Sequence, residues 1–168
     1  MIKIEDFSKE ELFFWLCDAS KLWLAHDGLW FQEVEKKFGL DIAIELDKYA
    51  WEKFSPIEAK RIMERLKLEK NGGLVALAKA LKARLYTILN EDELILKEKE
   101  LIYTMKSCRV QEARERKGMP LFPCKEVGIV EYSTFAKTID ERIKTECIFC
   151  PPDERKGEGY CSWLFKID

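Results

Sequence analysis

Histidine is almost absent from this sequence, which has one, His26, in 168 residues. Because histidine is the most common metal ligand and a frequent general base near neutral pH, its scarcity argues against a conventional zinc site or a cysteine–histidine dyad. Helical bundles that bind two metals through carboxylates usually carry Glu-x-x-His pairs, and no glutamate lies three residues before His26. Any chemistry must therefore use other side chains.

An excess of positive charge is also missing. The chain has 29 Lys and Arg residues against 31 Asp and Glu residues, a net charge of -2, which argues against a nucleic acid as partner. No apolar run is long enough to span a membrane, and the first residues lack the features of a signal peptide. We therefore expect a cytoplasmic protein, with its cysteines reduced and no membrane partner.

The length and composition are those of a globular domain. A chain of 168 residues with 47% apolar residues buries roughly 68–70% of its unfolded surface and needs no disulfide to hold a core. We expect a helical part over residues 1–73 and an α+β, cysteine-rich part over residues 74–168, joined in one compact unit.

Helical periodicity dominates the first half of the chain. Ser8 and Glu11 form a capping box that opens the first helix, and Asp27-Gly28 is expected to end it. A second capping box at 55–58 carries a proline at its first helical position, where a helix tolerates proline best. Glycines close the second and fourth helices at Gly39 and Asn71-Gly72-Gly73. The sequence thus predicts five helices before the first strand, over residues 8–27, 29–38, 41–54, 55–68 and 74–89.

Acidic side chains on these helices are expected to be structural. The simplest interpretation is that they pair with cations where helices meet, whereas His26 and Asp27 lie at a turn. The acids in question are Glu33, Asp47 and Glu58, and the expected partner cations are Arg61, Lys36 and Lys48.

Alternating periodicity replaces helical periodicity after residue 90. Strands are predicted over 93–97, 101–106, 142–149 and 160–167, and short helices over 109–117 and from Cys124 onward. The predicted fold class is α+β, with N-terminal helices followed by a roughly four-stranded antiparallel sheet and helices packed on it.

Five of the six cysteines lie between residues 108 and 161. Cys147 and Cys161 fall on the apolar faces of two strands that the intervening loop would pair, so we expect them to lie close together. Cys150 completes a Cys-x-x-Cys motif with Cys147. Cys108 leaves its strand at an element boundary and Cys124 begins a helix, so the thiols are expected to converge at one end of the sheet.

One interpretation of this convergence is a metal site. Cys147 and Cys150, with two of the remaining three thiols, would make a tetrahedral site for zinc or an iron–sulfur cluster in a sensor or structural module. Those three are Cys108, Cys124 and Cys161.

A second interpretation makes Cys124 a nucleophile. The helix start and neighbouring Lys125 would lower the pKa of its thiol, and Glu131 or Tyr132 would handle protons in place of histidine. A third interpretation is that the cysteines only pack in the core, since free cysteine is often buried. The protein would then be an interaction or dimerisation domain without catalysis.

Arginines and aromatic residues near the same end predict a ligand. Arg109 or Arg114 could hold a carboxylate through two parallel hydrogen bonds. Aromatic side chains would line the pocket, which suits a small anionic molecule. The aromatic candidates are Tyr103, Tyr132, Phe135 and Trp163.

The cysteine-centred motifs resemble a known group of proteins. The segments are 108–114 (CRVQEAR), 122–124 (FPC), 131–136, 147–153 (CIFCPPD) and 160–163 (YCSW), with further similarity at 27–31 and 58–61. They are similar to uncharacterised prokaryotic cytosolic proteins related to L-2-amino-thiazoline-4-carboxylic acid hydrolase. The resemblance implies an α+β small-molecule domain and hydrolysis of a small anionic ring compound containing C–N and C–S bonds.

Overall fold

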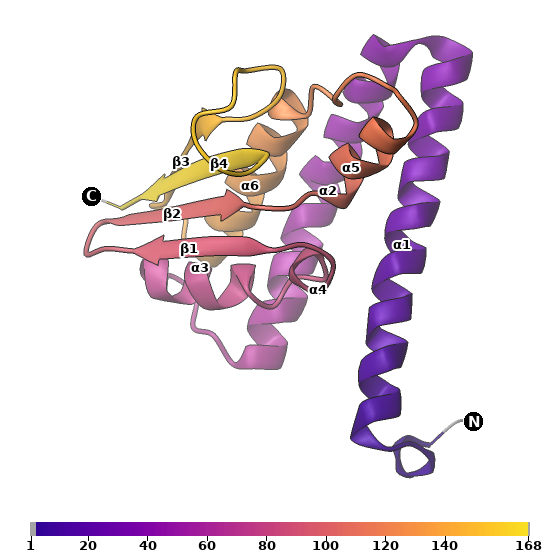
Figure 1. Cartoon of the computed structure of the whole chain (residues 1–168). Helices are drawn as coiled ribbons and strands as arrows, with labels where there is room; N and C mark the ends of the chain where they lie inside the picture. Colours follow the sequence, from indigo (N-terminus) through magenta and orange to yellow (C-terminus); the bar gives the residue numbers. More distant parts are fainter. Residues whose placement is uncertain (1–2, 168) are drawn as a thin grey trace.

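The computed structural model describes residues 3–167 and has the predicted α+β architecture (Figure 1). A 3-10 turn at Ile4–Asp6 leads into α1 (Lys9–Phe38), α2 (Leu40–Leu66), α3 (Gly73–Leu81) and α4 (Tyr86–Leu89). The second half contains β1 (Asp92–Leu96), β2 (Glu100–Met105), α5 (Arg109–Arg116), α6 (Lys125–Ile139), β3 (Lys144–Phe149) and β4 (Cys161–Lys166).

The four strands form one antiparallel sheet in the order β1-β2-β4-β3. Helices α3 and α6 pack against the sheet, α2 packs along α6, and α1 packs against α2 as the outermost element (Figure 1). The two hairpins therefore meet at the central β2–β4 pair, where Tyr103 lies opposite Trp163. No helix within residues 3–167 is both long and apolar enough to cross a membrane.

Helix α1 does not end at Asp27-Gly28 but continues to Phe38, which corrects the sequence-based prediction. An internal glycine costs a helix about 1 kcal/mol relative to alanine. Aromatic contacts on either side of Gly28 offset that cost: Trp23 stacks on Phe54 at 5.8 Å, and Phe31 meets Phe122 edge-on at 4.9 Å. The helix does end at Gly39, whose φ of +90° suits glycine.

Helix α2 likewise runs through Pro56, so the capping box predicted at 55–58 does not begin a helix. Proline inside a helix removes one backbone hydrogen bond. The buried face extends on both sides of it, with Trp51 before and Ala59 and Ile62 after, and this burial keeps the axis continuous. Two predicted pairs of helices are therefore two long single helices.

The helix predicted over 74–89 is divided in two. Helix α3 ends at Leu81, and a turn over 82–85 precedes α4. That turn directs the side chain of Arg84 into the interior, where it is 2% exposed. The strands, in contrast, lie within two residues of their predicted limits.

The main core lies between the sheet and α3 and α6. Its sheet residues alternate along the strands, as one buried face requires. A smaller aromatic cluster fills the space between α1, α2 and the segment before α6. Fully buried members of the main core are Leu77, Leu81, Leu101, Tyr103, Phe135, Ile139, Trp163 and Phe165.

Replacing Gly128 with alanine tests how closely α6 packs on the sheet. A Cβ at this position would lie 2.5 Å from Cζ2 of Trp163, so the substitution should lower the free energy of unfolding by about 1–3 kcal/mol. Gly28→Ala is the matched control, because a Cβ there meets nothing within 4 Å and should raise stability by about 0.5–1 kcal/mol. Urea unfolding measures both; equal effects would contradict the packing.

Candidate functional site

One cavity of about 550 Å³ lies between α1, α2, α5, α6 and the sheet. It is lined by residues from both halves of the chain, so neither half forms it alone. Nine of the twelve candidate site residues named from the sequence are in its wall: Cys108, Arg109, Arg114, Cys124, Glu131, Tyr132, Cys150, Cys161 and Trp163.

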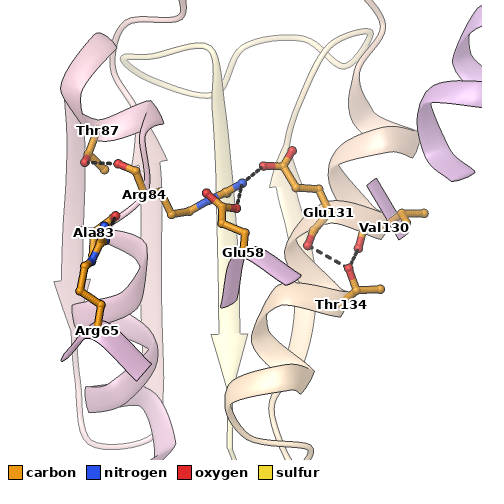
Figure 2. A network of polar contacts seen from close by, with 8 residues as sticks. All are labelled: Glu58, Arg65, Ala83, Arg84, Thr87, Val130, Glu131 and Thr134. Atoms are coloured by element: carbon orange, nitrogen blue, oxygen red, sulfur yellow. Dashed lines mark hydrogen bonds and ion pairs between the residues drawn. The ribbon is translucent and has the colours of Figure 1, made fainter. Parts of the chain in front are cut away.

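A buried arginine, Arg84, lies between Glu58 and Glu131 (Figure 2), and Glu131 lines the cavity. The Arg84 guanidinium lies 2.9 Å from Glu58 of α2 and 2.7 Å from Glu131 of α6. Burial alone would lower the pKa of Arg84, but the charges of Glu131 and Glu58 raise it well above its ordinary value. A single cation therefore holds α2 and α6 together through their carboxylates.

Aromatic rings surround the same guanidinium, which lies within the range of cation–π attraction. Burial raises the pKa of Tyr86 and of Tyr132 well above the ordinary value, so both hydroxyls stay protonated. The centroids lie at 4.9 Å for Phe135, 5.4 Å for Tyr86, 5.6 Å for Tyr132 and 5.8 Å for Trp51.

A group of carboxyls from three helices lies in the cavity wall. Asp27 of α1, Asp47 of α2 and Glu131 of α6 all line it. Burial, together with the charges of Asp27 and Glu131, raises the pKa of Asp47 to about 7. Burial also raises the pKa of Asp27. Asp47 can therefore give up and take back a proton at neutral pH, as a general acid–base group must.

The acidic residues of the helical half have partly different partners from those predicted from the sequence. Glu33 lies 4.0 Å from Lys36, but both are exposed on α1 and not where helices meet. Glu58 pairs with the buried Arg84 and not with Arg61, Lys36 or Lys48. Asp47 makes no ion pair within residues 3–167. The turn predicted at Asp27 is helix, and this places its carboxyl in the cavity wall.

Cys124 and Cys150 lie side by side in the cavity wall, with their sulfurs 3.4 Å apart. Cys124 is the residue just before the first turn of α6, and the Gln111 side-chain amide lies 3.4 Å from its sulfur. The hydrogen bonds from Cys150 and Gln111 lower the pKa of Cys124 despite its burial. Its hydrogen bonds with Cys124 and Cys161 raise the pKa of Cys150, so the proton stays on Cys150. Cys124 is the more readily ionised of the two.

The other two cavity thiols have different surroundings. Burial raises the pKa of Cys108 to about 12, and the Trp163 indole N–H donates to the Cys161 sulfur at 3.3 Å. Among the residues that the structure describes, no group of three or more Cys, His, Asp or Glu side chains has a geometry that could hold a metal ion. The zinc or iron–sulfur site predicted from the sequence therefore has no matching cluster of ligands among the described residues.

Three candidate residues lie outside the cavity wall. Phe135 is fully buried in the core, with its ring centroid 4.9 Å from the Arg84 guanidinium. Tyr103 is buried in the core behind Tyr132, with ring centroids 6.0 Å apart, so it supports the wall without lining it. The regular register of β3 and β4 places Cys147 opposite Trp163, not opposite Cys161, and the register shifts only beyond it, between Cys147 and Phe149. Burial raises the pKa of Cys147 to about 11. Of the two members of the Cys-x-x-Cys motif, only Cys150 lines the cavity.

The two arginines differ in availability. Arg114 is buried, and its guanidinium lies 3.1 Å and 3.3 Å from the Glu35 carboxylate oxygens and 2.8 Å from the Pro120 carbonyl. It ties α5 to α1. Arg109 is exposed at the cavity and makes no ion pair within residues 3–167, while its backbone N–H is fixed by Asn90 at 2.8 Å. Arg109 is therefore the better candidate for binding an anion.

Sequence reasoning missed the groups that the helical half supplies. Arg84 lies in the turn between α3 and α4, Asp47 and Trp51 lie on α2, and no local motif marks any of the three. The one available signal was composition: polar residues at positions that the 3.6-residue period places near an apolar face, as Asp47 is between Ala43 and Trp51.

Comparison with known proteins gives a family but no activity. A model described as "Family of unknown function (DUF6125)" matches residues 5–167, so the chain belongs to that family. No curated protein and no solved structure matches the chain significantly. The similarity to L-2-amino-thiazoline-4-carboxylic acid hydrolase is not tested by these comparisons and stays a prediction.

The pKa of Asp47 predicts how stability changes with pH. The folded protein keeps this proton up to a pH of about 7, whereas the unfolded chain releases it near 3.8. The folded state therefore binds more protons between these values, and stability should fall as pH rises through this window. Asp47→Asn should remove at most about 4 kcal/mol of that fall.

Urea unfolding at pH 4, 5.5 and 7.5 checks this prediction. Asp27 and Glu131 are also buried acids with raised pKa values, so some fall should remain in the variant. Glu52→Gln, at an exposed position on the same helix, should retain the wild-type dependence. An Asp47→Asn profile parallel to wild type would show that Asp47 is an ordinary acid.

Proposed function

We propose that this DUF6125 protein binds a small ring compound that carries a carboxylate, and hydrolyses a C–N or C–S bond in its ring. The observation that supports this most directly is the presence of two complementary groups in one cavity. Cys124 has a lowered pKa and Asp47 has a pKa of about 7. A nucleophile and an acid–base group in one pocket are the minimum for hydrolysis through a covalent intermediate.

The charges of the cavity suit a ligand with two different ends. Asp27, Asp47 and Glu131 favour a basic nitrogen, while Arg109 at the exposed side favours a carboxylate. Trp51 and Trp163 supply flat apolar surface for the ring between them. A cyclic amidine or thioimidate bearing a carboxylate, such as an aminothiazoline carboxylic acid, has these features.

The proposed reaction consumes one water. The Cys124 thiolate attacks the ring carbon between nitrogen and sulfur, the C–S or C–N ring bond breaks, and Asp47 gives its proton to the departing atom. The Asp47 carboxylate then takes a proton from water as the water attacks the same carbon. The bond to the Cys124 sulfur breaks, and the opened product leaves.

This assignment changes the proton-handling group expected from the sequence. Glu131 is held 2.7 Å from Arg84, and the raised pKa of Tyr132 keeps its hydroxyl protonated. We therefore give the acid–base role to Asp47. Glu131 and Tyr132 would instead contact the ligand and position the Arg84 side of the wall.

Hydrolysis of 2-amino-thiazoline-4-carboxylate, followed by mass spectrometry of the opened product, tests the proposal. Cys124→Ser and Asp47→Asn should each lower kcat at least about 100-fold, because each removes a group that acts in the transition state. Binding should remain, measured as a ligand-induced rise in Tm.

Cys147→Ser is the matched control, because Cys147 lies outside the cavity wall and should leave kcat unchanged. Arg109→Ala should raise Kd by about 10-fold or more, the loss of one charge-assisted hydrogen bond. Turnover by Cys124→Ser at the wild-type rate would exclude the mechanism. If the wild-type protein shows neither a Tm shift nor turnover with this compound, this substrate is excluded.

We also propose that two copies of the chain associate through α1. The outer surface of this helix is strongly apolar for a monomer. Trp15, Leu22 and Leu29 recur at seven-residue intervals, the spacing of a helix-pairing seam. Exposed large apolar residues on α1 are Phe13, Phe14, Trp15, Leu16, Leu22, Leu29, Trp30 and Phe38.

The accessible area supports a second copy as the occupant of that surface. The chain exposes 10602 Å², whereas a compact monomer of 19.8 kDa exposes about 8,600 Å². The excess of about 2,000 Å² is more than the roughly 800 Å² per partner that a standard interface buries.

An antiparallel arrangement fits the charges of α1. Its first turn carries Glu10 and Glu11, and its last turn carries Lys36 and Lys37. Antiparallel pairing of two copies about a twofold axis brings each acidic first turn near the partner's basic last turn. The dipoles of the two helices also favour the antiparallel arrangement. With Leu22 at the twofold axis, Trp15 of each copy would face Leu29 of the other.

Light scattering after size-exclusion chromatography tests this association. Wild type at about 50 μM should have twice the chain mass of 19.8 kDa. Leu22→Glu should give the single-chain mass, because it places two like charges at the axis. Val75→Glu, at another exposed apolar position, should remain a dimer; a monomeric wild type would contradict the proposal.

A further inference from the structure

The pair of thiols at the start of α6 has a geometry that hydrolysis does not require. A nucleophilic cysteine needs one thiol, yet Cys150 lies with its sulfur 3.4 Å from that of Cys124. We propose that Cys124 and Cys150 are a reversible oxidation site, in which Cys124 reacts with a small hydroperoxide and Cys150 closes a disulfide with it.

The backbone around the two thiols holds them opposite each other. The N–H of Lys125 donates to the Pro151 carbonyl at 2.9 Å, and the Lys125 ammonium lies 2.8 Å from the Asp153 carboxylate. The Asp153 N–H in turn donates to the Cys150 carbonyl at 2.9 Å. These contacts fasten the segment after β3 to the first turn of α6. The two sulfurs therefore need to approach by little more than an ångström to bond.

A second clamp fixes the Cys124 side. The buried Gln111 amide donates to the Phe122 carbonyl at 2.9 Å and accepts from the Phe122 N–H at 2.9 Å. The same amide nitrogen lies 3.4 Å from the Cys124 sulfur. Donors to this sulfur and its place at a helix N-terminus favour the thiolate, which is the form that attacks a peroxide.

The two thiols differ in how readily they ionise, so we assign the first reaction, with the peroxide, to Cys124 and the second, disulfide closure, to Cys150. The pKa of Cys124 is lowered and the pKa of Cys150 is raised, so Cys124 carries the charge and Cys150 keeps the proton. Both line the cavity, but only Cys124 is partly exposed there, so a small oxidant can reach Cys124, whereas Cys150 is 1% exposed. Cys161 also lies near Cys150, and its sulfur accepts the Trp163 indole N–H at 3.3 Å.

The reaction balances without a metal or an organic cofactor. The Cys124 thiolate attacks one peroxide oxygen, the O–O bond breaks, and the departing alkoxide or hydroxide takes a proton from solvent water and leaves as alcohol or water. This gives Cys124 sulfenic acid, with sulfur oxidised by two electrons and the peroxide reduced. The Cys150 sulfur then attacks the Cys124 sulfur, the S–O bond breaks, and the hydroxide leaves as water with the Cys150 proton. A thiol reductant restores both cysteines.

The inference shares Cys124 with the proposed hydrolysis but does not depend on it. Oxidation would block the nucleophile and so switch hydrolysis off. A disulfide that forms in a protein with no hydrolytic activity would exclude the hydrolase proposal alone. An active hydrolase in which no disulfide forms would exclude the oxidation site alone.

Peptide mapping of the intact chain tests the inference. Reduced protein is treated with one equivalent of hydrogen peroxide, blocked with N-ethylmaleimide and digested with trypsin. The expected product links residues 118–125 to residues 145–155, with Cys147 still alkylated and Cys17 and Cys108 free of disulfide. Dithiothreitol should release both peptides unchanged.

Two variants separate the roles of the cavity thiols. Cys150→Ser should form no disulfide and should leave a sulfenic acid at Cys124 that dimedone traps. Cys161→Ser is the matched control and should form the Cys124–Cys150 disulfide at a rate within about threefold of wild type. Circular dichroism confirms that each variant is folded. Unoxidised Cys124, or a disulfide between Cys124 and Cys161 in wild type, would overturn the inference.

Discussion

The buried ion pairs of Arg84 are the interaction on which the rest of the structure depends. A guanidinium removed from water costs several kcal/mol unless its partners compensate, and here Glu58 and Glu131 do so from two different helices. The aromatic rings around it exclude water from the pairs. The turn between α3 and α4 directs the Arg84 side chain into the interior. Its ion pairs with Glu58 and Glu131 fix the separation of α2 and α6.

The chemistry of the cavity follows from this arrangement. Arg84 neutralises one of its two carboxylates but leaves the wall with excess acid, so Asp47 and Asp27 cannot both ionise easily. At the other end of α6, the helix start and Gln111 favour charge on Cys124. Helix α6 thus carries a carboxylate paired with Arg84 in its middle and Cys124 at its N-terminus, and both line one cavity with Asp47 of α2. In the mechanism that we propose, Asp47 transfers the proton and Cys124 is the nucleophile.

The sequence predicted well what depends on local patterns. The alternation of apolar and polar residues located the four strands, and the helix predicted from Cys124 onward is α6. The helix ends predicted at Gly28 and before Pro56 were wrong. A helix-breaking residue acts locally, whereas the aromatic and aliphatic contacts that outweigh it come from distant elements. Arg84 could not be found for the same reason: its partners are 26 and 47 residues away, and its burial depends on a turn that the periodicity concealed.

The stability of an Arg84 series tests the central claim most directly. Arg84→Met leaves Glu58 and Glu131 buried without a counter-charge and should lower the free energy of unfolding by about 3–5 kcal/mol. Adding Glu58→Gln and Glu131→Gln removes those charges and should recover at least about 2 kcal/mol in urea unfolding at pH 7. A triple variant no more stable than Arg84→Met would show that the ion pairs do not hold the cavity wall together.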